Sequence, residues 1–400
     1  MRILYISSVC AQRRFDKLVE QGFINSQFQN QKFHHLVLKG LREISDVSID
    51  VVSFYPINRK YGRKLQYEEE EEGGVQYVYP GYINIPVLHH IIKFIQTFRF
   101  LKKGKRKDSV IVCNIMNFDE CFAALLFRFF YKTPICAITA DVPGLTSGAT
   151  GVYGNRWKKI MHDMVYPLYR SMSNKYDAYM FLASAMNEVV NSKSKPFIVV
   201  EGLADLSMQR IKNELSDKNP NRTIMYAGGI HREYGIELLV SAFKMLKDED
   251  VELHIYGKGN YEDDLKRISE VDHRVKYFGT KPNADIVKAQ IKAHLLVNPR
   301  TTDAEFVKYS FPSKIMESMA SGTPLLTTRI PSIPNDYYPY IYTFDVETID
   351  GFYNTLSKVL SLTSNDLYNK GAKAKSFILK EKNYRIQAGK LMNLLHGICA

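Results

Sequence analysis

The sequence has few cysteines and no hydrophobic run long enough to cross a membrane. Its five cysteines in 400 residues show neither paired short spacings nor the density of a disulfide scaffold, which favours reduced thiols in a cytosol. The longest apolar segment, residues 121–131, contains Arg128 and is well short of the ~20 residues that a spanning helix needs. The apolar run at the N-terminus is too short for a signal peptide. We therefore expect a cytoplasmic protein without a spanning segment.

Motifs that bind metals or nucleic acids are also lacking. No Asp-x-Asp motif follows a predicted strand, and the ten histidines show no metal-ligand spacing, so we expect no required metal and no cofactor. The sequence contains no helix-turn-helix, no zinc spacing and no aromatic-interleaved recognition module. We therefore expect no nucleic acid partner, although the formal net charge is +12.

The excess of positive charge is concentrated at 98–107, directly after apolar residues at near-helical spacing. These residues are Ile91, Ile92, Phe94, Ile95, Phe98 and Leu101. Two interpretations remain open. The segment is either a helix in peripheral contact with an anionic membrane leaflet, or a core-facing amphipathic helix that ends in a solvated basic loop.

Short β-branched runs alternate with helical patterns along the chain, which predicts an α/β protein with parallel sheets. The length and the 45% hydrophobic content suit two domains, and a polar stretch at 214–222 separates them. We predict domains at 1–205 and 222–375, a linker at 206–221 and a last helical piece at 376–400. An acidic run at 68–72 is predicted as a solvated turn. The predicted strands are 3–7, 48–54, 75–79, 110–114, 135–139, 178–182 and 197–200 in the first domain, and 223–227, 252–256, 275–278, 295–298 and 324–327 in the second.

The segment 311–326 predicts a helix that begins after Pro312 and carries Glu317 about one turn inside. The unpaired amides of Ser313 and Lys314 would point outward with the positive end of the helix dipole behind them, which favours an anion. Glu317 could accept hydrogen bonds from two hydroxyl groups. Together these groups suit a nucleotide sugar.

Two glycines, Gly228 and Gly229, follow a predicted strand of the second domain. Glycine allows the backbone to approach a phosphate closely, although two glycines alone more often mark only a turn.

These motifs resemble the donor-site signature of the retaining glycosyltransferases of family 4, the group 1 glycosyl transferases of bacterial polysaccharide biosynthesis. The signature is matched by Phe311-Pro312, by Glu317 and by the run from Ala320 through Gly322 to Pro324. Further matches in order and spacing lie at 225–230, 234–239, 253–259, 275–279 and 294–299. The resemblance covers about 220–330 well and the remainder in outline.

The resemblance implies the GT-B fold, in which two Rossmann-like domains face each other across a cleft. The donor would bind the second domain and the acceptor the first, and the last helix would return to the first domain. Phe311, Pro312 and Ser313 would belong to the donor site, and Glu317 would bind the paired ribose hydroxyls. A second Glu of the family, which contacts the sugar, is replaced here by Tyr309.

Relatives that need no metal compensate the departing diphosphate with an Arg and a Lys, and this chain has Gly229 and Tyr234 at those positions. Candidates to replace the two cations are Arg300, Lys314, His231 and Arg232. We favour Arg300 and Lys314, because a cation at a strand end and one at a helix start both lean into the cleft.

In the first domain, Asp141 follows a predicted strand where relatives often carry a His near the reacting carbon. It either orients the acceptor or the donor sugar, or caps a turn before Val-Pro-Gly.

The expected function is a retaining, metal-independent hexosyltransferase. It would move a hexosyl group from a nucleoside diphosphate sugar to a hydroxyl of a glycan or lipid-linked oligosaccharide, in surface polysaccharide biosynthesis at the inner face of the plasma membrane. Two alternatives remain: a nucleotide-sugar epimerase of the same fold and a non-catalytic scaffold.

Overall fold

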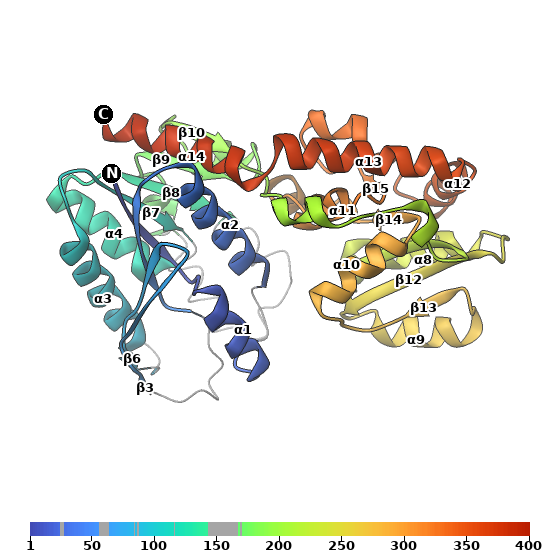
Figure 1. The fold of residues 1–400 in the computed structure, drawn as a ribbon, viewed down its shortest axis with the longest axis horizontal. Coiled ribbons are helices and arrows are strands. Elements are labelled where there is room, and N and C mark those ends of the chain that lie inside the picture. Colours follow the sequence, from blue (N-terminus) through green and yellow to red (C-terminus); the bar gives the residue numbers. More distant parts are fainter. Residues whose placement is uncertain are drawn as a thin grey trace. The chain divides into compact units, whose positions relative to one another are not determined.

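The computed structural model describes residues 1–24, 28–55, 64–83, 85, 88–115, 117–142, 167–168 and 170–400. The chain forms two compact units (Figure 1). The first consists of Met1–Leu203 together with Tyr384–Ala400, and the second of Ala204–Asn383. The sequence also predicts a helix at 157–173, and most of this segment lies outside the described residues.

The described strands of the first unit form one sheet in the order β10-β9-β8-β7-β1-β2-β5-β4. All neighbours are parallel except β4 and β5, which are antiparallel. The central strands β7 and β8 are buried along their whole length, as expected for a parallel sheet covered on both faces. The strands are β1 (Arg2–Ser7), β2 (Ser48–Ser53), β4 (Glu68–Glu72), β5 (Val75–Tyr79), β7 (Ser109–Asn114), β8 (Ile135–Thr139), β9 (Ala178–Phe181) and β10 (Phe197–Val199), with a small separate pair, β3 (Lys64–Leu65) and β6 (Tyr82–Ile83).

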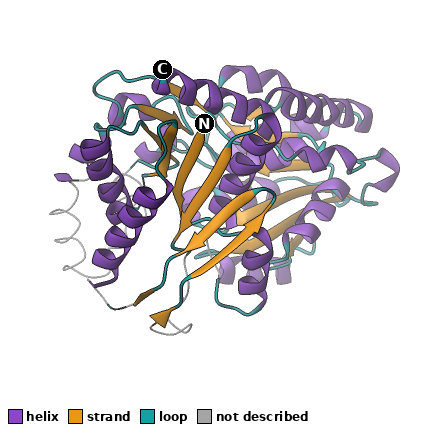
Figure 2. Ribbon diagram, turned by 60° about the vertical axis from the view of Figure 1, so that its left-hand side comes forward, coloured by secondary structure: helices purple, strands orange, loops and turns teal. Residues whose placement is uncertain are grey.

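Helices flank this sheet (Figure 2). α3 and α4 pack together against one face, and α14 packs on α2 on the other (Figure 1). A Cβ at Gly40 on α2 would lie 2.6 Å from both the Tyr384 carbonyl oxygen and Ala388 Cβ, so glycine allows α14 to approach closely. The described helices are α1 (Gln12–Glu20), α2 (Phe28–Ile44), α3 (Leu88–Gly104), α4 (Phe118–Tyr131), α7 (Met186–Val190) and α14 (Tyr384–Cys399).

The second unit has a parallel sheet in the order β13-β12-β11-β14-β15-β16. The chain starts at β11, adds strands on one side, and then continues on the other side of β11 from β14. This is the doubly wound order of a Rossmann fold, whose carboxyl edge has a switch point between β11 and β14. The strands are β11 (Arg222–Gly229), β12 (Val251–Lys258), β13 (Val275–Tyr277), β14 (Leu295–Asn298), β15 (Leu325–Thr328) and β16 (Tyr342–Phe344).

Two apolar cores stabilise this second sheet. One includes side chains of α8, α9 and α12, and the other includes side chains of α11 and α13. The described helices of the unit are α8 (Ile236–Lys244), α9 (Glu262–Val271), α10 (Asn283–Lys292), α11 (Ser313–Ser321), α12 (Ile349–Leu360) and α13 (Ser364–Glu381), with 3-10 turns η2 (Leu206–Arg210), η3 (Leu215–Asp217), η4 (Arg232–Tyr234), η5 (Glu305–Tyr309) and η6 (Asn335–Tyr340).

The unit boundaries differ from the predicted ones at the linker and at the last helical piece. The stretch predicted as a linker, 206–221, forms η2 and η3 and belongs to the second unit. The last helical piece divides at Asn383, because α13 stays with the second unit and α14 with the first. A bridge between Ala204 and Asn383 brings the two crossing points of the chain together.

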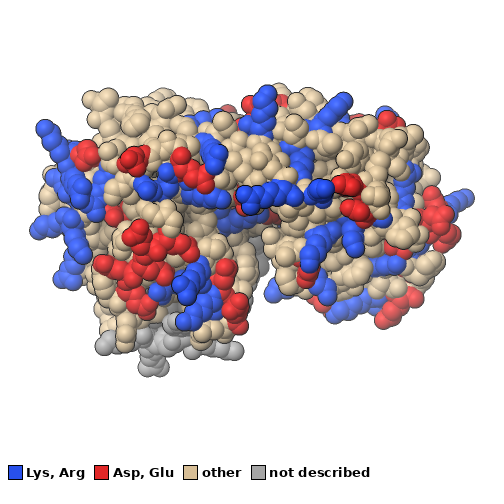
Figure 3. Space-filling view, in the orientation of Figure 1, with Lys and Arg blue, Asp and Glu red and all other residues tan. Residues whose placement is uncertain are grey.

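The prediction of a solvated turn at 68–72 is wrong, because these residues form strand β4. Figure 3 shows the acidic side chains gathered over this strand, next to basic ones. Glu68 and Glu70 both bind the guanidinium of Arg14, and this pairing offsets the mutual repulsion that would otherwise disorder consecutive glutamates.

Among the described residues, no helix is both long and apolar enough to span a bilayer.

Candidate functional site

The residues proposed for donor binding gather at the switch point of the second unit. β11 ends at Gly229, β14 ends at Asn298, and α11 begins at Ser313. Open α/β sheets bind ligands outside the carboxyl ends of their strands at such a point, where neighbouring loops diverge.

Lys314 extends from the first turn of α11 to the end of β11. A Cβ at Gly228 would lie only 1.9 Å from its Nζ, so the absence of a side chain there makes room for the ammonium group. The same nitrogen lies 5.5 Å from the centre of the Tyr226 ring. Burial lowers the pKa of Lys314 to about 8, with Glu317 acting to raise this pKa and Arg300 to lower it. The sequence-predicted Lys314, Glu317 and Arg300 are therefore close enough to interact electrostatically.

Arg300 lies two residues beyond β14, between two aromatic rings. Its guanidinium carbon is 4.9 Å from the centre of the Phe306 ring and 5.7 Å from that of Tyr234. The Arg300 carbonyl accepts a hydrogen bond from the Thr328 hydroxyl at the end of β15. The loop after β14 is also anchored at Thr302. Its amide and its hydroxyl donate hydrogen bonds to the Glu347 carboxylate, at 2.8 Å and 2.9 Å. These contacts fix a guanidinium at the sheet edge.

The glycine at the end of β12 has a different function from Gly228. Gly257 has φ +131°, and a Cβ there would lie 1.7 Å from the carbonyl oxygen of Gly228. Glycine is thus required for β11 and β12 to remain close up to their ends. The backbone beside Lys314 is positioned by this contact.

The start of α11 has no side-chain cap from its N-cap residue, Pro312. Ser313 is exposed, while Pro312 is buried and holds the entry of the helix in place. Exposed amides at a helix start carry partial positive charge and favour an anion. Glu317 is partly buried one turn further along.

Tyr309 and Phe311 are buried, at 5% and 6% exposure. Phe311 belongs to the core beside α11, where its ring centre is 5.6 Å from that of Tyr337. Both side chains therefore pack inside the second unit. We place Phe311 with the structural frame of α11.

His231 and Arg232 follow β11 on the glycine loop. The His231 ring lies 5.3 Å from that of Tyr234, and a Cβ at Gly229 would contact the His231 ring at 3.0 Å. Arg232 forms ion pairs with Glu237 and Asp264. Arg232 is thus engaged on the surface, whereas His231 adjoins the Gly228 and Gly229 turn.

Asp141, the candidate in the first unit, lies two residues beyond β8 and is half-buried. It therefore occupies the carboxyl edge of its own sheet, as expected. Residues 143–166, which follow it, lie outside the described part of the chain.

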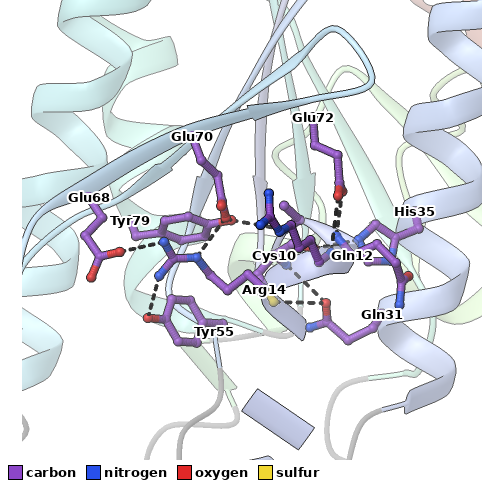
Figure 4. Close-up of polar contacts among 12 residues, drawn as sticks. Cys10, Gln12, Arg14, Gln31, His35, Tyr55, Glu68, Glu70, Glu72 and Tyr79 are labelled. Carbon is purple, nitrogen blue, oxygen red and sulfur yellow. Dashed lines mark hydrogen bonds and ion pairs between the residues drawn. The ribbon is translucent and has the colours of Figure 1, made fainter. Parts of the chain in front are cut away.

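The carboxyl edge of the first unit also holds a polar network that the motifs did not reveal (Figure 4). The carboxylate of Glu72 accepts the amides of Gln12 at 2.6 Å and Arg13 at 3.2 Å, so the start of α1 is closed by a carboxylate from β4. Gln31 accepts the Cys10 amide at 3.1 Å and donates to the Ser8 carbonyl at 2.7 Å, which fixes the loop after β1. The only sequence signal for this network is the acidic run itself.

The ionic part of this network is centred on Arg14. Its guanidinium binds Glu70 at 2.7 Å and Glu68 at 2.5 Å, and Glu70 also accepts the hydroxyl of Tyr79 at 2.5 Å (Figure 4). The Tyr79 hydroxyl in turn accepts the amide of Ala11 at 3.0 Å. The amides of Gln12 and Arg13 at the start of α1 are already bonded to the Glu72 carboxylate. We therefore expect this helix start not to bind a further anion such as phosphate.

Residues 221–361 match the family model described as Glycosyl transferases group 1. Among curated proteins, no sequence matches the chain.

Solved structures resemble the chain over its whole length. Sucrose-phosphate synthase from Thermosynechococcus elongatus is 13% identical, with a TM-score of 0.69 over 99% of each chain. Anabaena HepE, in complex with UDP and glucose, is 11% identical, with a TM-score of 0.65 over 99% of this chain and 100% of its own. The lipopolysaccharide outer core galactosyltransferase WaaB is 13% identical, with a TM-score of 0.65 over 99% of each chain.

These likenesses show that the chain has the GT-B fold, built from two Rossmann-like units. The predicted fold class is confirmed, and the match to the group 1 glycosyl transferase model lies within the second unit.

Proposed function

We propose that this GT-B chain is a retaining glycosyltransferase that moves a hexosyl group from a nucleoside diphosphate sugar to a hydroxyl of a glycan. The observation that carries the proposal is that Lys314 Nζ reaches Gly228 at the switch point of the second unit, close enough to Glu317 and Arg300 for both to influence its pKa. Two cations and a carboxylate there match the two ends of such a donor. A cationic pair suits the diphosphate, and a carboxylate suits the ribose hydroxyls.

The donor would bind with its diphosphate against the first turn of α11. The amides of Ser313 and Lys314 and the close backbone at Gly228 and Gly229 would contact phosphate oxygens, with His231 beside them. Glu317 would accept hydrogen bonds from two ribose hydroxyls.

Transfer requires the bond between the anomeric carbon and the diphosphate oxygen to break, with its electron pair leaving on the diphosphate. Arg300 and Lys314 would stabilise that developing charge, a task in which one well-placed group contributes about 100-fold or more. In the front-face mechanism the acceptor oxygen bonds to the same face of the sugar, and its proton passes to the departing phosphate oxygen. This proposal needs no metal and no side-chain base.

The acceptor would bind the first unit, with Asp141 orienting it or the donor sugar. A glycan acceptor that bears the attacking hydroxyl agrees with the likeness to a lipopolysaccharide galactosyltransferase. We extend the proposal to lipid-linked glycans of surface polysaccharide biosynthesis, made at the cytoplasmic face of a membrane.

The test is a panel of nucleoside diphosphate sugars given to the purified protein, scored by release of nucleotide with and without glycan acceptors. We expect release that depends on acceptor. Glu317→Ala should abolish most of it, and Arg300→Ala and Lys314→Ala should each slow transfer by about 100-fold.

Matched controls are Glu270→Ala and Lys373→Ala, which remove exposed charges of the same unit. Both should retain the wild-type rate. Full activity in Glu317→Ala would contradict the assigned donor site. A new isomer of the free nucleotide sugar would instead indicate an epimerase, and absence of nucleotide binding would indicate a non-catalytic scaffold.

A further inference from the structure

The charged side chains of α4 are buried or ion-paired along its length. Its acidic residues Asp119 and Glu120 are turned inward, at 9% and 0% exposure, and Arg128 is paired with Asp177 at 2.7 Å. What remains outside is aromatic, with Phe129 and Phe130 exposed at 65% and 62%. A surface helix of a globular protein normally places polar side chains on its outward side.

Helix α3 continues the apolar surface. The two helices pack through aromatic rings. The ring centres of Phe94 and Phe122 are 5.5 Å apart, and those of Phe98 and Phe127 are also 5.5 Å apart. They lie side by side in both ribbon views (Figures 1 and 2). We call the exposed apolar residues of this pair the α3–α4 face; they are Leu88, Ile91, Ile95, Phe122, Phe129 and Phe130.

Basic side chains border this face where the two helices end. Lys105 lies 4.6 Å from the centre of the Tyr131 ring, and Lys132 lies 5.3 Å from that of Phe129, so the cations adjoin the exposed aromatics. Figure 3 shows Lys and Arg side chains along the edge of the view that α3 and α4 occupy in Figure 1. The exposed cations of this border are Arg99, Lys102, Lys103, Lys105, Arg106, Lys107 and Lys132.

Few acids offset these cations. Glu69 lies 3.7 Å from Lys103, and Asp108 is bound to the amino group of Met1 at 3.0 Å. An apolar surface bordered by unbalanced positive charge complements an anionic bilayer, which offers acyl chains beneath phosphate groups. A second copy of this chain would bring the same cations together across a symmetric interface, which opposes self-association.

We infer that the α3–α4 face docks on an anionic lipid surface, with Phe129 and Phe130 inserted at the headgroup level and the basic border on the phosphates. The inference names a partner for the proposed function, since a lipid-linked acceptor would be held at that surface. It does not depend on sugar transfer, because vesicle binding and nucleotide release are measured separately.

The experiment is co-sedimentation of the full chain with vesicles of pure phosphatidylcholine, or of phosphatidylcholine with about a third phosphatidylglycerol. We expect binding to the anionic vesicles that weakens as salt is added. Phe129→Ser with Phe130→Ser should weaken it by about tenfold or more. Lys102→Gln, Lys105→Gln and Lys107→Gln together should remove most of the preference for phosphatidylglycerol, at about fivefold for each cation.

The control removes an apolar residue that is even more exposed, at 88%, and two exposed cations from the second unit, as Val271→Ser, Lys212→Gln and Lys380→Gln. It should bind vesicles as the wild type does, and thermal melting should show all variants folded. Equal binding of the wild type to both vesicles, no binding to either, or an unchanged Phe129→Ser/Phe130→Ser variant would overturn the inference. A wild-type dimer that this variant dissociates would overturn it as well, by showing that the face binds another copy.

Discussion

Lys314 carries its positive charge in surroundings that disfavour it, because burial lowers its pKa to about 8. Below that pH the side chain is an ammonium that attracts a diphosphate, and above it the side chain becomes neutral. Affinity for the nucleoside diphosphate should therefore fall above about pH 8, by up to tenfold per pH unit. Calorimetric titrations at a series of pH values would measure this directly.

Lys314→Arg is the control variant for that experiment, since a guanidinium stays protonated over the same pH range. Its affinity should change little with pH, even if it is lower throughout. A wild-type affinity that stays constant from about pH 7 to pH 9 would show that Lys314 does not contact the diphosphate.

The sequence predicts the place of some site residues well and the burial of others not at all. Glu317, Lys314 and Gly228 belong to motifs whose spacing fixes their place on a helix start and a strand end, and the structure brings Lys314 against Gly228. The burial of Tyr309 and Phe311 could not be predicted, because it depends on packing against side chains far away in the sequence, such as Tyr337.

Three strands that have a neighbour on both sides were predicted without error. β5, β8 and β14 have the predicted bounds, since β-branched and apolar runs between turns leave little ambiguity. That β4 is a strand could not be predicted, because five consecutive glutamates show no alternation of apolar and polar residues. Their carboxylates are instead held by partners far away in the sequence, which are Arg14 and the start of α1. Neither β16 nor α12 is among the predicted elements, although both complete the second unit.

The ends of β11 and β12 offer a test that separates function from stability. In Gly228→Ala the new methyl group meets two side-chain ends, Lys314 Nζ and the Tyr226 hydroxyl. The ammonium should therefore shift and donor affinity should fall at least tenfold, with a smaller loss of stability than a clash with backbone would cause. In Gly257→Ala the methyl group meets backbone in a conformation that favours glycine. We expect that variant to lose about 2–3 kcal/mol of folding free energy.

Chemical denaturation and nucleotide titration of the two variants would check both parts. Normal nucleotide binding by Gly228→Ala would contradict the role of Gly228 in the donor site. Unfolding of Gly257→Ala at the wild-type denaturant concentration would contradict the role of Gly257 in stability.

At the scale of the whole molecule, the chain passes from the first unit to the second at Leu203 and returns at Tyr384. α14 is therefore part of the first unit, where it packs on α2 and where Tyr384 donates to Glu43 at 2.9 Å. Truncation after Asn383 should lower the melting temperature of the first unit and leave that of the second nearly unchanged.

Calorimetry with and without a nucleoside diphosphate would assign the two transitions, because the ligand stabilises only the unit that binds it. We expect nucleotide to raise the melting temperature of the second unit in the truncated chain too. A truncation that abolishes nucleotide binding would contradict this division of the molecule.

The return of the chain at Tyr384 also sets an order for folding during synthesis. The second unit is complete once Asn383 has left the ribosome, whereas the first, although translated earlier, lacks a helix until 384–400 emerge. Until then the side of α2 that α14 will cover stays open, with Gly40 at its centre. The half of the protein that is made first is therefore the half that matures last.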